Sequence, residues 1–540
     1  HDNPISRLDL DENFTKLKAL ISKKGYLEEL ISSNLLLNQH RLTFELRPDT
    51  QFNENLENYF SQTLQAKEES LSEKDKQEIS ELASALKERQ EAVDDVEILP
   101  KVTIEDIPLK REYSEESFAI GNRSVYEAGT NGLIYTDFLF PCSNLTAQEL
   151  LYSSLYTFVL TEVGLDGSSY EEIQALQSSV TGGFNASIKL QTKNPKDPGK
   201  LFLSISSKCL EGNFVEMEKL ILDTIKFVRF DESSRIQDLL NIFIARNEES
   251  LNQNGHYLAM NSAASSLNEL AATSFQMSGL KMLNETKANV SGAQESSDTS
   301  SIIKILQSIH HKVQPTPSKI FTACSPKALK DTSAAFEESQ STAEQDLIEL
   351  KDAEIGWITG SQVCYCAEAF QGVSRDHPDA PALSVLATVL RNGFLHTAIR
   401  EKGGAYGAGA SNDTSTNTFK FFSYRDPKCS ETFSAFQDAI KWAETSITDQ
   451  HLEEAILGVV SSIDKPLSPV GEAKNDFNFN LEGISISERL EMRQKIINCT
   501  IDDLIRVNKK YLTAESKKSV LAGEGYKVEA EELGLMLIEV

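Results

Sequence analysis

The stretch Arg400-Glu401-Lys402-Gly403-Gly404-Ala405-Tyr406-Gly407-Ala408-Gly409 places a guanidinium and a phenol six residues apart across a glycine break. Before it, Pro381–Leu390 and His396–Arg400 are predicted to be helical, with the leucines of the first segment at helical spacing. After the glycines, Tyr406–Ala410 has only small residues behind the tyrosine, which is typical of a strand that another backbone approaches closely. The sequence therefore predicts a helix, a tight turn and a strand, with Arg400 and Tyr406 on either side of the turn.

Two interpretations of this pair are open from the local pattern. Arginine offers a permanently charged planar fork, and a tyrosine hydroxyl is a neutral donor. Both groups suit a carbonyl oxygen or a developing oxyanion. In the structural alternative, Arg400 satisfies the carbonyls at the helix C-terminus and Tyr406 is a half-buried strand residue.

Further motifs occur on both sides of this stretch. They are Asn38-Gln39-His40-Arg41, Arg47-Pro48-Asp49, Thr161-Glu162-Val163-Gly164, Thr181-Gly182-Gly183-Phe184 and Phe421-Phe422-Ser423-Tyr424-Arg425-Asp426-Pro427. In this order, and together with Arg400–Tyr406, they resemble the presequence-protease branch of the pitrilysin/insulinase zinc metallopeptidases. The resemblance covers essentially the whole chain.

The resemblance implies an architecture. Enzymes of this family consist of two halves, each of two related α/β domains, joined by a helical hairpin. The expected fold class is α+β, with two tandem related α/β-sandwich domains whose sheets are rich in antiparallel strands and carry helices, preceded by a helical-hairpin linker. We assign residues 1–49 to the end of a preceding domain and 50–103 to the linker. Residues 104–330 form a third domain and 331–540 a fourth domain with the Arg/Tyr pair.

The family's zinc site is missing from this sequence. It requires His-x-x-Glu-His on a helix, where one turn brings both imidazoles to the metal and the glutamate activates the bound water. The nearest match, His451-Leu452-Glu453-Glu454-Ala455, has alanine in place of the second histidine, and the adjacent His310 and His311 cannot face one ion from a helix. We expect no metal in this chain. Zinc and the general base are expected from the missing N-terminal half, so this chain alone is predicted to be inactive.

The function implied by the resemblance is that of the C-terminal half of a zinc metalloendopeptidase, which degrades unstructured peptides inside a closed chamber. By residue-to-residue match, Tyr406 would stabilise the oxyanion together with the other half. Arg400 and Tyr406 would both contact substrate. Two alternatives remain: a non-catalytic structural or regulatory subunit of the same family, and a peptide-binding module that does not cleave.

Composition excludes some partners. The 540 residues carry a formal net charge of −28, which opposes binding to nucleic acid or to an anionic membrane. Basic peptides would be favoured if the acidic groups line a cavity, but a merely solvated acidic exterior explains the same charge. No apolar run approaches the length of a membrane span, and the first residues have no signal-peptide pattern.

The seven cysteines are scattered, and Cys364-Tyr365-Cys366 is the only close pair. This spacing indicates neither a disulfide framework nor a zinc knuckle, so we expect an intracellular, reducing compartment. That compartment would be the cytoplasm of a bacterium, or the mitochondrial matrix or a plastid of a eukaryote.

Periodicity predicts several elements. An amphipathic helix is expected from Leu8 to Ile21, and a half-buried strand over His40–Arg47 with Leu42, Phe44 and Leu46 on one side. The polar residues 50–99 suit a helical hairpin, with a disordered linker as the alternative. Capping boxes at Thr146-Ala-Gln-Glu149 and Ser169-Tyr-Glu-Glu172 each predict a helix start.

Overall fold

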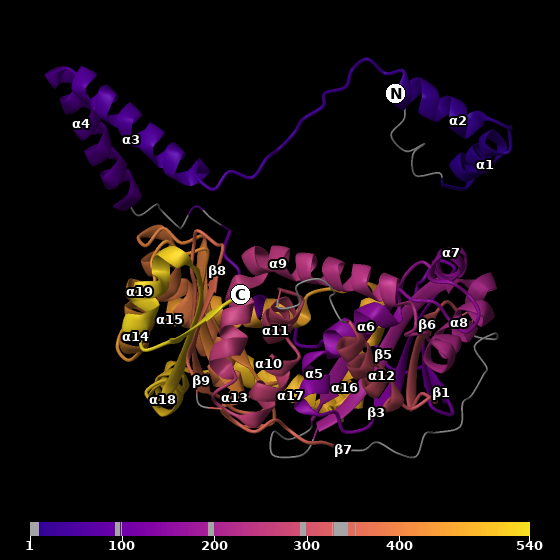
Figure 1. Cartoon of the computed structure of the whole chain (residues 1–540). Coiled ribbons are helices and arrows are strands. Elements are labelled where there is room, and N and C mark those ends of the chain that lie inside the picture. The colour runs from indigo at the N-terminus through magenta and orange to yellow at the C-terminus, as the bar shows by residue number, and fades with distance from the viewer. Residues whose placement is uncertain are drawn as a thin grey trace. The chain divides into compact units, whose positions relative to one another are not determined.

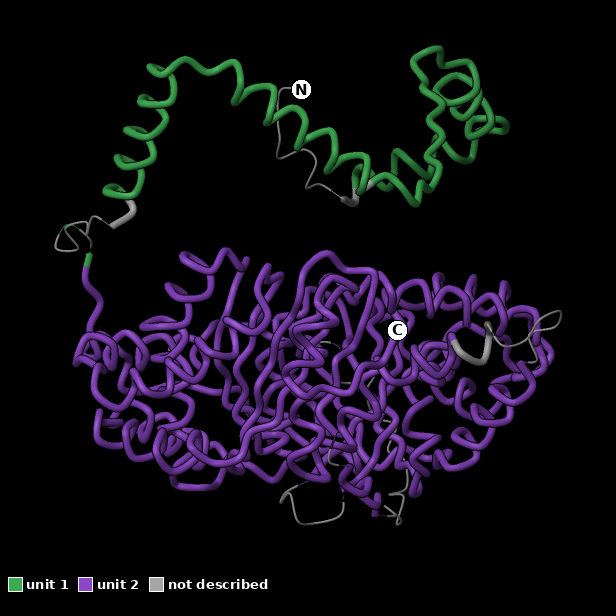
Figure 2. Tube along the Cα trace, turned by 60° about the vertical axis from the view of Figure 1, so that its left-hand side comes forward, with its two compact units in different colours: residues 1–100 green, residues 101–540 purple. Residues whose placement is uncertain are grey.

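The computed structural model describes residues 10–91, 98, 100–192, 199–291, 299–326, 328, 344–351 and 353–540. The chain divides into two compact units, residues 1–100 and residues 101–540, which Figure 2 shows in different colours. Each unit is described by itself.

Helices make up most of the described part of residues 1–100. The helices are α1 (Leu10–Ile21), α2 (Tyr26–Ile31), the π-helix η2 (Ser32–Leu36), α3 (Phe52–Ser70) and α4 (Glu73–Glu91). The amphipathic first helix is confirmed from Leu10 onward, whereas Leu8 lies outside the described residues. A turn at Leu71-Ser72 joins α3 to α4, and Ser72 caps α4 by accepting the Asp75 N–H at 3.3 Å. The polar segment therefore forms two helices rather than a disordered linker.

The strand predicted over His40–Arg47 is wrong. These residues belong to no strand, and the side chains of Leu42, Phe44 and Leu46 are 87%, 77% and 84% exposed. The alternation of apolar and polar residues is present, but a strand forms only when a neighbour accepts and donates its backbone hydrogen bonds. Within the described residues, no strand pairs with this segment. Its apolar side chains are therefore exposed.

The first sheet of residues 101–540 has the strand order β1-β2-β6-β3-β5-β4, with β7 paired to β5. Its strands are β1 (Phe118–Ile120), β2 (Arg123–Glu127), β3 (Leu133–Cys142), β4 (Phe184–Gln191), β5 (Gly199–Leu210), β6 (Lys319–Cys324) and β7 (Glu344–Gln345). Only β2 and β6 are parallel. Both predicted capping boxes are confirmed, since Thr146 and Ser169 accept backbone N–H groups at the starts of α5 and α7.

In the described part of the chain, eight α-helices lie between β3 and β6 in sequence. They are α5 (Ala147–Leu151), α6 (Ser153–Leu160), α7 (Tyr170–Val180), α8 (Phe214–Phe227), α9 (Ser233–Ala264), α10 (Glu269–Gln276), α11 (Leu280–Ser291) and α12 (Ser300–His311).

The second sheet has the order β10-β11-β9-β12-β8-β13. Its strands are β8 (Ile355–Thr359), β9 (Tyr365–Gln371), β10 (Gly407–Asp413), β11 (Thr418–Tyr424), β12 (Ser516–Gly523) and β13 (Met536–Glu539). Its helices are α13 (Ala380–Leu390), the π-helix η7 (Arg391–Glu401), α14 (Ser430–Ala443), α15 (Asp449–Asp464), α16 (Pro469–Leu481), α17 (Ile486–Ile497), α18 (Ile501–Tyr511) and α19 (Lys527–Glu532). Two mostly antiparallel sheets with helices confirm the α+β fold class.

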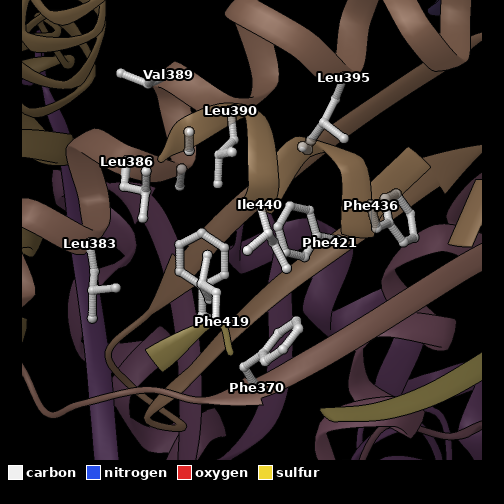
Figure 3. Packing of buried hydrophobic residues seen from close by; sticks show 14 of the residues in the cluster. Phe370, Leu383, Leu386, Val389, Leu390, Leu395, Phe419, Phe421, Phe436 and Ile440 are labelled. Carbon is white, nitrogen blue, oxygen red and sulfur yellow. The ribbon is translucent and has the colours of Figure 1, made fainter. Parts of the chain in front are cut away.

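A large hydrophobic core covers one face of the second sheet. Phe370, Phe419 and Phe421 from the strands meet leucines of α13 and Phe436 and Ile440 of α14, as Figure 3 shows. Each of these side chains is at least 96% buried. Burying such side chains contributes about 1.5–3 kcal/mol each, so this face is the main source of stability for the second sheet.

The two sheets exchange helices. Helix α9 leaves the first region and packs on the opposite face of the second sheet (Figure 1), where a Cβ on Gly255 would lie 2.6 Å from the Tyr365 ring. In return, α16 packs on the first sheet, where Phe477 contacts Phe321 and Asp476 accepts the Tyr126 hydroxyl proton at 3.0 Å. One face of each sheet is therefore covered by a helix from the other part of the sequence.

The continuous helix Ala380–Glu401 is long and apolar enough to cross a membrane by length and composition alone, with a mean hydropathy of 1.2. Half of that window is buried inside the protein. Its leucines pack in the core of Figure 3, which accounts for its apolar character.

Candidate functional site

The predicted helix, turn and strand around Arg400 are present. Helix α13 continues without a break into η7, whose end is marked by the bond from the Lys402 N–H to the Thr397 carbonyl at 3.0 Å. A Cβ on Gly403 would lie 2.4 Å from the Ile399 carbonyl oxygen, and Gly404 has φ +88°. Only glycine adopts this turn without strain. The turn places Tyr406 directly before the first residue of β10.

Arg400 and Tyr406 lie together on the surface. The Arg400 guanidinium is 5.9 Å from the centroid of the Tyr406 ring, and the tyrosine is 67% exposed. Within the described residues, the Tyr406 hydroxyl has no hydrogen-bond partner and Arg400 has no ion pair or carbonyl to cap. Both elements of the structural alternative, a half-buried tyrosine and a carbonyl-capping arginine, therefore disagree with the geometry.

Tyr424 and Arg425 extend this pair. The Tyr406 ring meets the Tyr424 ring edge-on, with centroids 5.6 Å apart, and the Arg425 guanidinium lies 5.4 Å from the Tyr424 centroid. Arg425 has φ +48°, which is unusual for a residue with a side chain and marks a backbone held by its surroundings. The sequence placed these residues in a family motif but offered no signal for their contact with Tyr406.

His256 packs against Tyr424. Its ring, on α9, meets Tyr424 edge-on with centroids 4.9 Å apart, and burial lowers the pKa of the imidazole. Sequence analysis missed His256 because α9 comes from the region before the second sheet. Its imidazole is neutral at pH 7, so it adds no charge beneath the two arginines.

We name Arg400, Tyr406, Tyr424 and Arg425 the tyrosine–arginine patch. It presents two guanidinium groups and a phenol whose hydroxyl has no hydrogen-bond partner among the described residues, on a chain that is otherwise strongly acidic. Such groups can bind and polarise a carbonyl or hold a carboxylate. They supply no nucleophile, general base or metal, so the patch can position and stabilise a reacting group but cannot hydrolyse a peptide alone.

The histidines considered as metal ligands have structural roles. His451 is in the capping box of α15, where its Nδ1 accepts the Thr448 N–H at 3.2 Å. The Nδ1 of His310 lies 3.0 Å from the Tyr156 hydroxyl, and burial lowers the pKa of His310 to about 4. Each of these contacts engages Nδ1 alone, so it is the absence of His-x-x-Glu-His from the sequence that argues against a zinc site here.

A cavity of about 1260 Å³ lies elsewhere, between edge strands β4 and β10. Ile188 and Leu190 line it from β4, Ala410 lines it from β10, and Arg375 and Arg489 add positive charge. Neither Arg400 nor Tyr406 is among its lining residues. The tyrosine–arginine patch is thus an open surface rather than part of this cavity.

Comparison with known protein families gives two matches. Residues 46–288 match the model of the region associated with subfamily C of the M16 peptidases, and residues 360–522 match the "PreP C-terminal domain". The second match contains the whole tyrosine–arginine patch.

Curated relatives align over nearly the full chain. The mitochondrial presequence protease of Danio rerio is 27% identical over 552 residues, covering 95% of this chain and 53% of the relative. That of Schizosaccharomyces pombe is 26% identical over 542 residues, covering 98% of this chain and 54% of the relative. The chain therefore spans about half the length of the curated relatives it matches.

Solved structures share the fold. A protease from Helicobacter pylori superposes with a TM-score of 0.54 at 13% identity, covering 76% of this chain and all of that structure. A peptidase M16 inactive domain from Pseudomonas fluorescens gives a TM-score of 0.52 at 17% identity, covering 76% of this chain and 97% of that structure. At these identities the likeness establishes the fold alone.

Proposed function

Since this chain belongs to the presequence-protease branch of the M16 peptidases and corresponds to their C-terminal half, we propose that it is the half of a zinc metalloendopeptidase that contacts and encloses peptide substrates. Its partner is the N-terminal half, on the same chain or a separate one. Residues 1–49 then end a preceding domain, 50–103 link the halves, and 104–330 and 331–540 form the third and fourth domains.

The observation that carries this proposal is the tyrosine–arginine patch. Among the described residues, the exposed Tyr406 has no partner for its hydroxyl and the neighbouring Arg400 has no ion pair, so both polar groups can meet a ligand. Both groups suit a peptide carbonyl near the scissile bond. We assign oxyanion stabilisation to Tyr406, and substrate contact to Tyr406 and Arg400.

The residues of this chain do not fit the catalytic zinc of the family. The sequence has no His-x-x-Glu-His, and His451 and His310 use a ring nitrogen in capping and packing contacts. We therefore assign zinc and the general base to the other half.

Substrates in this proposal are unstructured peptides, with basic ones favoured by the net charge of −28. The relatives are named as mitochondrial, and none of the seven cysteines, all of them among the described residues, forms a disulfide. Both findings suit a reducing intracellular compartment, with the mitochondrial matrix as the first choice.

Replacement of Arg400 tests the positioning role. In the enzyme reconstituted with its N-terminal half, Arg400→Ala is expected to lower kcat/KM roughly ten- to a hundredfold, the scale of losing one hydrogen bond to a charged group. Arg400→Lys should rescue poorly, because an ammonium cannot reproduce the planar fork. Lys402→Ala removes the same charge two residues away and serves as the control. Unchanged kcat/KM in Arg400→Ala would remove Arg400 from the substrate site.

The exposed segment around Leu42 makes a second prediction. Three large apolar side chains on an unpaired stretch favour association, so the chain alone should sediment as concentration-dependent oligomers. Replacing Leu42, Phe44 and Leu46 by serine should reduce the association, and adding the N-terminal half should suppress it in the unmodified chain.

A matched control replaces Leu64, Leu82 and Leu86, which are 66%, 71% and 57% exposed on α3 and α4, by serine. Equal sedimentation of both triple variants would show that the segment around Leu42 is not the site of association.

A further inference from the structure

Three cysteine thiols meet in the core of the second sheet. Cys364 and Cys366 are fully buried, and Cys429 is 1% exposed. The Sγ atoms of Cys364 and Cys366 are 3.8 Å apart, those of Cys366 and Cys429 are 3.9 Å apart, and all three lie within 4.8 Å of one another. Among the described residues, they form the one group of histidine, cysteine and acidic side chains close enough to share a metal ion.

The backbone explains how residues so far apart in sequence converge. Cys364 and Cys366 are two residues apart at the start of β9, so their side chains share a face of the sheet. Cys364 forms an antiparallel bridge with Asp426, exchanging two N–H to carbonyl bonds of 2.9 Å. This bridge fixes the chain three residues before Cys429, which is the N-cap of α14.

The spacing of the sulfurs matches that of ligands on one ion. Metal–thiolate bonds of about 2.3 Å place sulfurs roughly 3.8 Å apart at tetrahedral angles and 4.0 Å apart at trigonal angles. The two measured separations lie in this interval. The sulfurs of the third pair, Cys364 and Cys429, lie within 4.8 Å of each other.

Two acidic side chains bond to the backbone on either side of Cys429. Asp426 is fully buried, and its carboxylate accepts the Thr432 hydroxyl at 2.7 Å and the Lys428 N–H at 3.0 Å. The carboxylate of Glu529 accepts the Ser430 N–H at the start of α14, at 3.1 Å.

We propose that Cys364, Cys366 and Cys429 bind one copper(I) ion in three-coordinate geometry, at a site separate from the catalytic zinc assigned to the other half. Soft thiolates select soft ions, and structural zinc is held by four ligands, whereas no fourth ligand side chain joins this group among the described residues. The ion arrives as copper(I), so no redox step is needed. Three Cu–S bonds form as the thiols of Cys364, Cys366 and Cys429 release their three protons to solvent.

The test is a titration of the whole, reduced, metal-free chain with copper(I) in the absence of oxygen, against the chromogenic chelator bicinchoninate. We expect one copper(I) ion per chain to be withheld from the chelator, with X-ray absorption showing three sulfurs at about 2.3 Å. Cys366→Ala and Cys429→Ser should lower the affinity for copper(I) at least tenfold. Cys142→Ser and Cys499→Ser alter buried cysteines outside the cluster and should bind like the unmodified chain.

Complete transfer of copper to bicinchoninate by the unmodified chain would overturn the proposal, as would retained binding in Cys366→Ala. Four-coordinate zinc, bound in preference to copper(I), would overturn the assignment of the ion. If the cluster variants fail to fold, the titration and X-ray absorption of the unmodified chain still decide, because two-sulfur or four-sulfur copper contradicts the geometry.

Discussion

The purified chain is expected to cleave no unstructured peptide, and mixing it with the N-terminal half that carries His-x-x-Glu-His is expected to produce cleavage that a zinc chelator abolishes. The reason is chemical, since the tyrosine–arginine patch offers donors and positive charge but neither an activated water nor a base. The measurement is the rate of cleavage of a fluorogenic peptide by each half separately and by the mixture.

The N-terminal half alone is the control, because the proposed function assigns to it every zinc ligand and assigns the patch to the present chain. Chelator-sensitive cleavage by the present chain alone, with zinc bound through His451 or His310, would contradict the assignment of the metal to the other half. Cleavage by the N-terminal half at the full rate of the mixture would show that this chain takes no part in catalysis.

Tyr406→Phe is expected to lower kcat of the reconstituted enzyme roughly a hundredfold, the scale of losing one oxyanion-hole donor. The substitution keeps the ring against Tyr424 and removes a hydroxyl that has no partner among the described residues. The melting temperature of the chain should therefore stay the same. Measuring kcat and melting temperature on the same preparation separates a catalytic effect from a folding defect.

Tyr59→Phe provides a matched control, because Tyr59 on α3 is 64% exposed and its loss should leave kcat unchanged. Unchanged turnover in Tyr406→Phe would show that the patch binds substrate at most and takes no part in the chemical step. A lower melting temperature with normal turnover would assign Tyr406 to stability alone.

Much of the fold follows from local chemistry in the sequence. The capping boxes at Thr146 and Ser169 start helices because their side-chain oxygens accept backbone N–H groups that have no partner inside the helix. The turn at Gly403-Gly404 is predictable for the same kind of reason, since backbone geometry there admits only glycine. Such features depend on a few neighbouring residues, which a single sequence contains.

Contacts between distant residues could not be predicted in this way. His40–Arg47 has the alternation of a strand but no strand, because pairing depends on a neighbour that periodicity cannot supply. Arg400 and Tyr406 were found because six residues separate them, whereas the contact of His256 with Tyr424 joins two distant regions. The cysteine cluster was missed because Cys429 lies 63 residues beyond Cys366.

The exchange of helices between the two sheets also affects how the chain folds during synthesis. Asp476 follows Tyr126 by 350 residues, which a ribosome takes roughly 20 to 70 seconds to add at about 5–20 residues per second. The face formed by Tyr126, Phe202 and Phe321 is complete only once Phe321 has been added, and for the rest of that interval it has no α16 to cover it. The growing chain therefore carries an uncovered aromatic surface, and neighbouring nascent chains can associate through it before the helix emerges.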